Sequence, residues 1–249
     1  MLFHPFLVKN PTKVLTFLYK SLIIGTLMFY NCEVFPMAKD SAISLRVIQR
    51  LPRYYRFLYD LKENGITRIS SRELAQRMRL TASQIRQDLN CFGGFGQQGY
   101  GYLVDQLYDE IGHILGMDKL TKTILLGVGN LGTAVGNHID FKSRGFHLIG
   151  LFDDNPELVG DTRADMTIRS TAEVEAFCRK EKPEMAVLCI PKEAAPRLVE
   201  VLVDCGVKGF WNFSHYDILN DYPDVIVENV HMGDSLMTLS YHMMQSEAE

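Results

Sequence analysis

The feature that most constrains this chain is an apolar run that leads directly into a glycine-rich turn. Residues 123–126 are followed by Gly127-Val128-Gly129-Asn130-Leu131-Gly132. In such a strand-to-helix turn the first glycine allows the tight bend, the second lets the backbone approach a pyrophosphate, and the third lets the helix pack on the strand. The diphosphate then lies at the helix N-terminus, where free N–H groups favour an anion. The motif predicts a dinucleotide-binding unit.

An acidic residue after the next apolar run supports this interpretation. Residues 146–152 lead into Asp153, which lies 21 positions beyond Gly132. An acid at this distance accepts hydrogen bonds from the adenosine ribose hydroxyls and repels a 2′-phosphate. No arginine follows Asp153 directly, because the next residues are Asp154-Asn155-Pro156. The sequence therefore predicts NAD(H) rather than NADP(H) as the ligand.

The segments beyond Asp153 alternate between helix and strand patterns. Ser170 and Glu173 are spaced as a capping box for a helix that runs to about Lys180, and Gly206 ends a second predicted helix over 193–205. Apolar runs at 185–190 and 209–213 predict strands. This alternation predicts an α/β fold with a doubly wound parallel sheet.

The charge of the chain is unevenly placed. The whole chain carries −4, but residues 37–102 hold 11 Lys and Arg against five Asp and Glu, a net +6. From residue 103 onward, 12 basic residues face 24 acidic ones, a net −12. A basic module joined to an acidic one is expected when only the first meets nucleic-acid phosphates.

The basic module has the pattern of a small helical DNA-binding domain. We expect a first helix with Pro52 in its first turn that ends at Asn64-Gly65, and a second over 71–78 with a capping box at its start. Thr81 is placed to cap a third helix. The outward face of that third helix offers polar groups able to contact base edges in a major groove. Residues 92–102, rich in glycine and aromatics, are predicted to form a hairpin wing.

Cysteine and histidine spacing argues against other classes of site. The five cysteines are scattered and form no CxxC pair, and the seven histidines make no metal-binding ladder. We therefore expect no metal, no disulfide framework and a cytoplasmic protein.

Residues 1–36 do not fit this picture. Val14 to Phe35 is largely apolar with lysines in front, so a signal peptide or a short membrane anchor is one interpretation. The segment has no clear cleavage site, and Met37-Ala38-Lys39-Asp40 is typical of a natural start. Our preferred hypothesis is that residues 1–36 are a mis-called extension and that the protein has no membrane partner.

Several strings together resemble one family. They are residues 50–58, 70–75 and 84–89, the Phe-Gly-x-Phe-Gly wing and the turn 127–132. From about Ala42 to the C-terminus the chain is similar to the Rex family of redox-sensing transcriptional repressors. The resemblance implies a winged helix-turn-helix domain followed by a Rossmann domain, pairing of two chains, and operator DNA binding governed by the NADH/NAD⁺ ratio.

The resemblance also implies roles for individual residues. The turn Gly127 to Gly132 and Asp153 are expected to bind NADH or NAD⁺, with Pro191 near the nicotinamide half and Tyr102 connecting the wing to the cofactor domain. The predicted DNA-binding residues are Arg53, Ser70, Ser71, Ser83, Gln84, Arg86, Gln87, Gln97, Gln98 and Tyr100. Two departures stand out: Gln97-Gln98 replaces basic residues of many members, and His231 replaces an acid of some members.

The predicted organisation has four parts: 1–36, a winged-helix domain over 37–119, a Rossmann domain over 120–230 and a final helix over 231–249. An apolar stripe on the final helix is formed by Met232, Leu236, Leu239 and Met243. Such a helix docks either on its own domain or on another chain. The resemblance favours a domain-swapped helix inserted into the partner of a homodimer, which places two DNA-binding domains on a palindrome.

Two other functions fit parts of the chain. An NAD-dependent dehydrogenase with an atypical N-terminal domain would need an acid/base group, for which His215, after the strand predicted over 209–213, is the one plausible candidate. A CoA-binding module on the same fold is disfavoured by Asp153. We expect no catalytic residues and no enzymatic activity.

Overall fold

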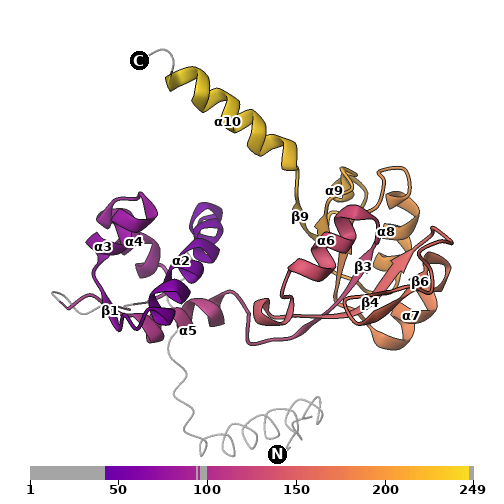
Figure 1. Cartoon of the computed structure of the whole chain (residues 1–249), viewed down its shortest axis with the longest axis horizontal. Coiled ribbons are helices and arrows are strands. Elements are labelled where there is room, and N and C mark those ends of the chain that lie inside the picture. Colours follow the sequence, from indigo (N-terminus) through magenta and orange to yellow (C-terminus); the bar gives the residue numbers. More distant parts are fainter. Residues whose placement is uncertain (1–42, 94, 96–99, 247–249) are drawn as a thin grey trace, which may run out of the picture. The chain divides into compact units, whose positions relative to one another are not determined.

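The computed structural model describes residues 43–93, 95, 100–246 of the 249-residue chain (Figure 1). The hypotheses about residues 1–36 and the predicted DNA contacts of Gln97 and Gln98 lie outside the described residues.

The described residues of the N-terminal domain form four helices and one short strand pair. Its elements are α2 (Leu45–Glu63), β1 (Arg68–Ile69), α3 (Ser71–Met78), α4 (Ala82–Asn90), β2 (Tyr102–Leu103) and α5 (Val104–Ile114). One apolar core unites them, with Leu51, Leu58, Leu74, Ile85 and Leu107 all buried. Helices α3 and α4 pack directly on one another across the short turn 79–81. This pair is a helix-turn-helix, as predicted.

Both helices of this pair begin where the sequence predicts. The N–H of Glu73 donates to Ser70 Oγ at 3.1 Å, and the N–H of Ser70 donates to Glu73 Oε2 at 2.8 Å, which completes the capping box of α3. The N–H of Gln84 donates to Thr81 Oγ1 at 3.1 Å and caps α4. These bonds satisfy N–H groups that the helix itself leaves free.

The predicted start of the first helix is wrong. Helix α2 begins at Leu45, and Pro52 lies inside it rather than in its first turn. The apolar face continues upstream through Val47 and Leu51, which are buried. Pro52 and Ile48 are exposed, so water can satisfy the Ile48 carbonyl group that the proline leaves without a donor.

Residues 94 and 96–99 of the predicted hairpin wing lie outside the described residues. Strand β2 pairs antiparallel with β1, with Ile69 opposite Tyr102 and Arg68 opposite Leu103. Among the described residues, the arm that pairs with β2 therefore precedes α3 and does not lie within 92–102. The pairing is between segments more than thirty residues apart, which local turn chemistry does not reveal.

The second domain is a doubly wound sheet. Its strands are β3 (Thr121–Leu126), β4 (Phe146–Asp153), β5 (Thr162–Arg163), β6 (Met166–Ser170), β7 (Met185–Leu188), β8 (Gly209–Asn212) and β9 (Ile226–Asn229). The sheet order is β5-β6-β4-β3-β7-β8-β9, and all pairs are parallel except β5 with β6. From β6 to β9 this is the order of the dinucleotide-binding fold, with the strand order reversing between β3 and β7.

Helices cover both faces of the sheet. They are α6 (Asn130–His138), α7 (Val174–Glu181), α8 (Ala195–Asp204) and α9 (Ile218–Asp221), with 3₁₀ turns η1 (Lys142–Arg144) and η2 (Thr171–Glu173). Ile124 and Leu126 pack in the core that α7 and α8 complete, whereas Leu125 packs in the core that α6 completes. Alternating side chains of one strand thus supply two apolar layers.

Several predicted boundaries in this domain need correction. Ser170 Oγ accepts from the Ala172 N–H at 3.3 Å, and the Glu173 carboxylate pairs with Arg169 at 3.5 Å, so no capping box forms. The reason is that residues 171–173 form the η2 turn before α7 begins at Val174. The predicted strands end early, at Leu188 and Asn212, and the predicted helix over 193–205 is shorter at both ends.

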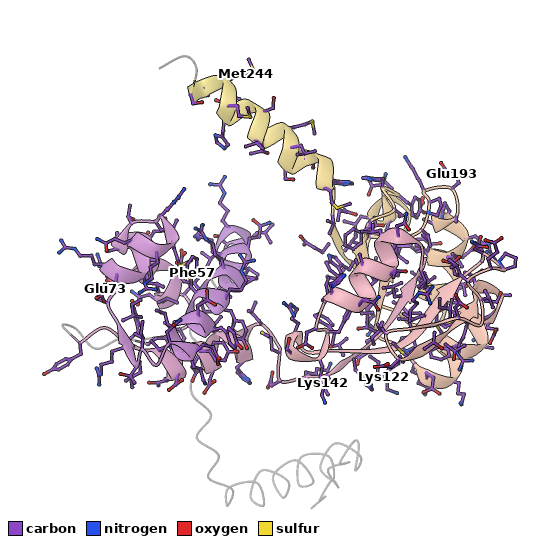
Figure 2. All side chains as sticks on the ribbon, viewed as in Figure 1. Phe57, Glu73, Lys122, Lys142, Glu193 and Met244 are labelled. Carbon is purple, nitrogen blue, oxygen red and sulfur yellow. The ribbon has the colours of Figure 1, made fainter. Side chains whose placement is uncertain are left out.

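The C-terminal helix α10 (Met232–Ser246) buries none of its residues. Figure 2 shows its side chains, Met244 among them, projecting from the ribbon. The exposed large apolar residues are Met232, Leu236, Met237, Leu239, Tyr241, Met243 and Met244. In the part of the chain that the structure describes, no helix is long and apolar enough to cross a membrane.

Candidate nucleotide site and nucleic-acid interface

The glycine turn lies at the point where the strand order reverses. The N–H of Gly127 donates to Phe152 O at 2.8 Å, and the N–H of Cys189 donates to Leu126 O at 2.8 Å. These bonds join the carboxyl ends of β4, β3 and β7. Ligands of open α/β sheets bind in the crevice outside this edge.

Each of the three glycines has its own geometric reason. Gly127 has a φ of +87°, and a Cβ added there would lie 2.4 Å from Cys189 O. A Cβ on Gly132 would lie 1.7 Å from Gly127 O, so only glycine lets α6 pack this close to the strand end. Gly129 is different, because an added Cβ meets nothing within 4 Å.

The open space at Gly129 fits a diphosphate. Gly129 precedes Asn130, the first residue of α6, and no acidic residue lies in the first turn of that helix. Thr133 Oγ1 donates to Val128 O at 2.8 Å and fixes the turn from within. The exposed backbone N–H groups at this helix start favour an anion. The residues of this turn therefore suit the diphosphate of a dinucleotide.

Asp153 lies beside the same turn. It ends β4, is 8% exposed, and accepts from the Val128 N–H at 2.6 Å and from the Asn155 N–H at 2.9 Å. Each carboxylate oxygen has a second lone pair, so the group retains acceptor capacity for ribose hydroxyls. Asp153, which lies 21 residues beyond Gly132 in the sequence, thus contacts the glycine turn directly.

The two remaining predicted cofactor residues lie in different places. Pro191 is exposed in the loop after β7, two residues beyond Cys189, whose carbonyl oxygen a Cβ on Gly127 would meet. Tyr102 is 7% exposed in the core of the N-terminal domain, and burial raises its pKa. The β2 strand places Tyr102 opposite Ile69, where its ring packs in the core of the N-terminal domain. The link between Tyr102 and the cofactor domain stays a prediction.

The outward face of α4 matches the prediction. Ser83, Arg86 and Gln87 are exposed, while Ile85 and Leu89 are buried. Arg86 Nη1 donates to the Ser71 hydroxyl at 3.2 Å, so this face extends onto Ser71 at the start of α3. Polar side chains at the N-terminal end of a recognition helix are those that reach base edges.

Other predicted DNA contacts already have partners within the protein. Arg53 Nη2 donates to Met78 O at 2.6 Å, at the C-terminal end of α3, and the guanidinium lies 5.8 Å from the Phe57 ring centroid. Ser70 serves as the cap of α3. Tyr100, within the predicted wing, is 71% exposed. The DNA contacts of these residues remain predictions.

A buried carboxylate that sequence reasoning missed lies on the inward face of α4. Asp88 is fully buried and accepts from Arg50 Nε at 2.6 Å and Arg50 Nη2 at 2.7 Å, from the Tyr54 hydroxyl at 2.8 Å and from Gln84 Nε2 at 2.8 Å. Burial raises the pKa of Asp88, but the hydrogen bonds from Arg50, Gln84 and Tyr54 outweigh it and hold that pKa below its ordinary value. The sequence signal that could have revealed this buried carboxylate is an acidic residue that lies between two apolar residues, Ile85 and Leu89, on one helix.

His215 is not placed as a general base. Its Nδ1 lies 2.7 Å from His231 Nδ1, and the two rings stack with centroids 4.8 Å apart. It follows β8, as the sequence predicts, and a further parallel strand, β9, lies beyond β8 in the sheet. Among the described residues, no group of three or more His, Cys, Asp or Glu side chains is arranged to hold a metal ion.

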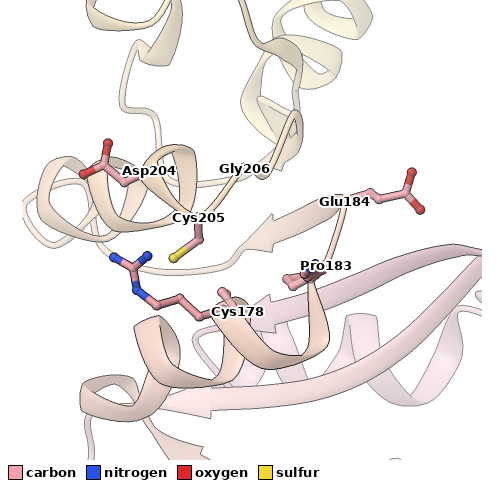
Figure 3. A pocket seen from close by; sticks show the side chains of 8 residues that line it. Cys178, Pro183, Glu184, Asp204, Cys205 and Gly206 are labelled. Atoms are coloured by element: carbon pink, nitrogen blue, oxygen red, sulfur yellow. The ribbon is translucent and has the colours of Figure 1, made fainter.

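A hollow of about 460 Å³ lies elsewhere, between the C-terminal ends of α7 and α8 (Figure 3). Its lining includes Cys178, Glu184, Cys205 and Gly206. Glu184 and Gly206 precede β7 and β8, so the hollow is at the sheet edge opposite the glycine turn. Burial raises the pKa of Cys178 to about 12, which keeps its thiol protonated.

Two known families match successive parts of the chain. Residues 42–90 match the family described as "Putative DNA-binding protein N-terminus", and residues 118–216 match "CoA binding domain". The division agrees with the two domains described above.

Curated relatives match over most of the chain. The "Redox-sensing transcriptional repressor Rex" of Thermoanaerobacter sp. (strain X514) is 50% identical over 211 residues, which cover 85% of this chain and 94% of that protein. The Rex of Clostridium perfringens (strain SM101 / Type A) is 45% identical over 214 residues, 86% of this chain and all of that protein.

Solved structures show the same similarity. RSP in complex with β-NAD⁺ and operator DNA is 48% identical and has a TM-score of 0.75. The match covers 83% of this chain and 94% of the RSP chain. RSP in complex with β-NADH is 46% identical, with a TM-score of 0.76 and coverage of 84% and 97%. At this identity and coverage the chain belongs to the Rex family of redox-sensing transcriptional repressors.

Proposed function

We propose that this chain is a DNA-binding transcriptional repressor that senses the NADH/NAD⁺ ratio. One observation carries the proposal: a single chain joins a helix-turn-helix with an exposed polar helix face to a sheet whose switch point presents an open Gly129 beside Asp153. The relatives support it, since RSP was solved with operator DNA and NAD⁺ and also with NADH.

The nucleotide site has a defined division of work. The N–H groups from Gly129 onward, at the start of α6, bind the diphosphate, and Asp153 accepts from the adenosine ribose. When bound, the nucleotide supplies the redox-dependent nicotinamide ring. No hydride transfer is required, and the one candidate base, His215, is engaged with His231.

Repression follows from a population shift. The state of the protein that binds NADH better is the state that binds operator DNA worse, so NADH releases the operator. A tenfold loss of operator affinity requires only about 1.4 kcal/mol of differential binding. The protein acts on chromosomal DNA, which places it in the cytoplasm.

The functional unit is a homodimer that is held together by α10. Seven large apolar side chains are exposed on this helix in the single chain, an arrangement that a partner chain would bury. Two copies then place two α4 helices on a palindromic operator.

The proposal is tested by titrating labelled DNA from upstream of the protein's own gene, following fluorescence anisotropy at one salt concentration. Parallel titrations contain no nucleotide, NAD⁺, NADH or CoA. Specific binding released by NADH alone confirms the function. Binding that responds only to CoA, or no specific binding, contradicts it.

A further inference from the structure

The carboxylate of Asp88 is saturated by donors from two helices. Arg50 contributes two parallel N–H groups and Tyr54 a hydroxyl, all from α2, and Gln84 contributes an amide N–H from α4 itself. Asp88 is fully buried. A buried charge this well paired does not leave its geometry without a large cost, so the four bonds hold their donors in fixed positions.

This arrangement decides which way the Gln84 amide points. An ionised carboxylate accepts hydrogen bonds and donates none. Of the two ends of the Gln84 amide, only Nε2 can face Asp88 Oδ1, at 2.8 Å. A flip of the amide would aim Oε1 at the carboxylate, acceptor against acceptor. The carbonyl oxygen Oε1 is therefore directed away from Asp88.

Gln84 also occupies a position from which bases are read. It is the third residue of α4, next to the exposed Ser83 and one turn before the exposed Gln87. Its side chain is half-buried, at the rim between the apolar face and the outward face. Residues near the N-terminus of a recognition helix contact base edges in the major groove.

We propose that Asp88 is a positioning residue that presents Gln84 to DNA as a hydrogen-bond acceptor, so that this chain selects a base with an exocyclic amino group at one position of each half-site. In the major groove those bases are adenine, through N6, and cytosine, through N4. Guanine and thymine present O6 and O4 there, which repel Oε1. The inference rests on the proposed function, because it specifies what the DNA-binding domain reads.

The test removes the hydrogen-bonding group from each side of the contact in turn. The intact chain is titrated with operator duplexes in which one adenine at a time is replaced by purine, which lacks the 6-amino group, or one cytosine by pyrimidin-2-one, which lacks the 4-amino group. We expect one position per half-site at which the wild-type chain loses about tenfold in affinity, the size of one hydrogen bond to a base. Gln84→Leu is expected to lose this sensitivity at that position alone.

Two further variants separate positioning from direct contact. Gln87→Leu, on the exposed face, is the matched control and should leave the sensitive position of Gln84 unchanged. Asp88→Asn frees the amide to flip, and we expect guanine or thymine at the sensitive position to bind within about threefold of the preferred base. If Asp88→Asn does not fold, the Gln84→Leu series alone decides the inference.

Opposite results overturn it in distinguishable ways. A Gln84→Leu chain that senses the same amino-group deletion as wild type refutes the inference while the proposed function stands. If the Gln84→Leu chain instead loses sensitivity to O6 of a guanine or O4 of a thymine, Gln84 acts as a donor and the inference is refuted equally. If the wild-type chain binds no DNA sequence specifically, the proposed function fails and the inference fails with it.

Discussion

At the scale of single residues, the glycines of the nucleotide turn divide into two kinds. Gly127 and Gly132 are required by the protein's own packing, because a Cβ at either would collide with backbone. Gly129 meets no protein atom and is required only if something else approaches it. The fold therefore predicts different consequences for substitutions that look alike in the sequence.

Gly129→Ala should separate binding from folding. Its φ of −65° is ordinary for alanine, so we expect an unchanged thermal midpoint, while the new methyl group occupies the space of the diphosphate and weakens NADH binding at least tenfold. Gly132→Ala is the matched comparison, and overpacking should cost about 3 kcal/mol. Calorimetric titration and thermal melting measure both effects. Wild-type NADH affinity in Gly129→Ala would contradict the assigned site.

The second prediction concerns Asp88 and the loss of stability of α4 at acid pH. Its pKa is lowered in the folded protein, so its stabilising contribution is complete above the unfolded aspartate pKa of about 3.9 and is lost as the pH falls through the folded value. We expect hydrogen-exchange protection of α4 to fall below pH 4 in the wild type. Asp88→Asn should lower this protection already at pH 6, by about 3 kcal/mol, and flatten its acid dependence.

An exposed ion pair provides the control for this experiment. Asp105 lies 3.2 Å from Lys62, with both side chains largely exposed. Asp105→Asn should change protection in the N-terminal domain by less than about 1 kcal/mol. Equal effects of the two substitutions would show that the Asp88 network is not a special source of stability.

At the scale of elements, the sequence was informative wherever the controlling interaction is local. The α3 capping box joins residues three apart, and the glycine turn and Asp153 follow a fixed interval, so all were predicted. The start of α2 was missed because proline is common in the first turn of helices, whereas Pro52 lies inside α2 and is tolerated there on an exposed face. The β1–β2 pair and the Arg50–Asp88 bond join distant segments, which periodicity does not reveal.

Helix α10 makes the third prediction. In the proposed homodimer a partner chain buries its exposed apolar stripe, and burying a leucine contributes about 1.5–3 kcal/mol. Leu236→Asp with Leu239→Asp should therefore weaken dimerisation more than a hundredfold, measured by sedimentation velocity. Gln245→Asp is the control, because it lies about 200° around the helix from Met243. A double variant that remains dimeric would place the interface elsewhere.

At the scale of the whole molecule, the two domains meet different ligands and carry different charge. Residues 37–102 are net positive and the rest of the chain beyond them is net negative. The acidic part repels DNA phosphates, so operator binding depends on the first domain and falls with salt. If the nucleotide controls operator binding, a coupling free energy must therefore link the nucleotide site to the DNA-binding site.

That coupling makes the last prediction, because linkage is reciprocal. If NADH lowers operator affinity by some factor, saturating operator must lower NADH affinity by the same factor. We expect the two factors, measured by anisotropy and by NADH fluorescence at one salt concentration, to agree within about twofold. Gly129→Ala should retain operator affinity yet require at least tenfold more NADH for release. Loss of operator binding without a matching loss of NADH affinity would show that NADH inactivates the protein irreversibly, since any equilibrium between states obliges the two factors to be equal.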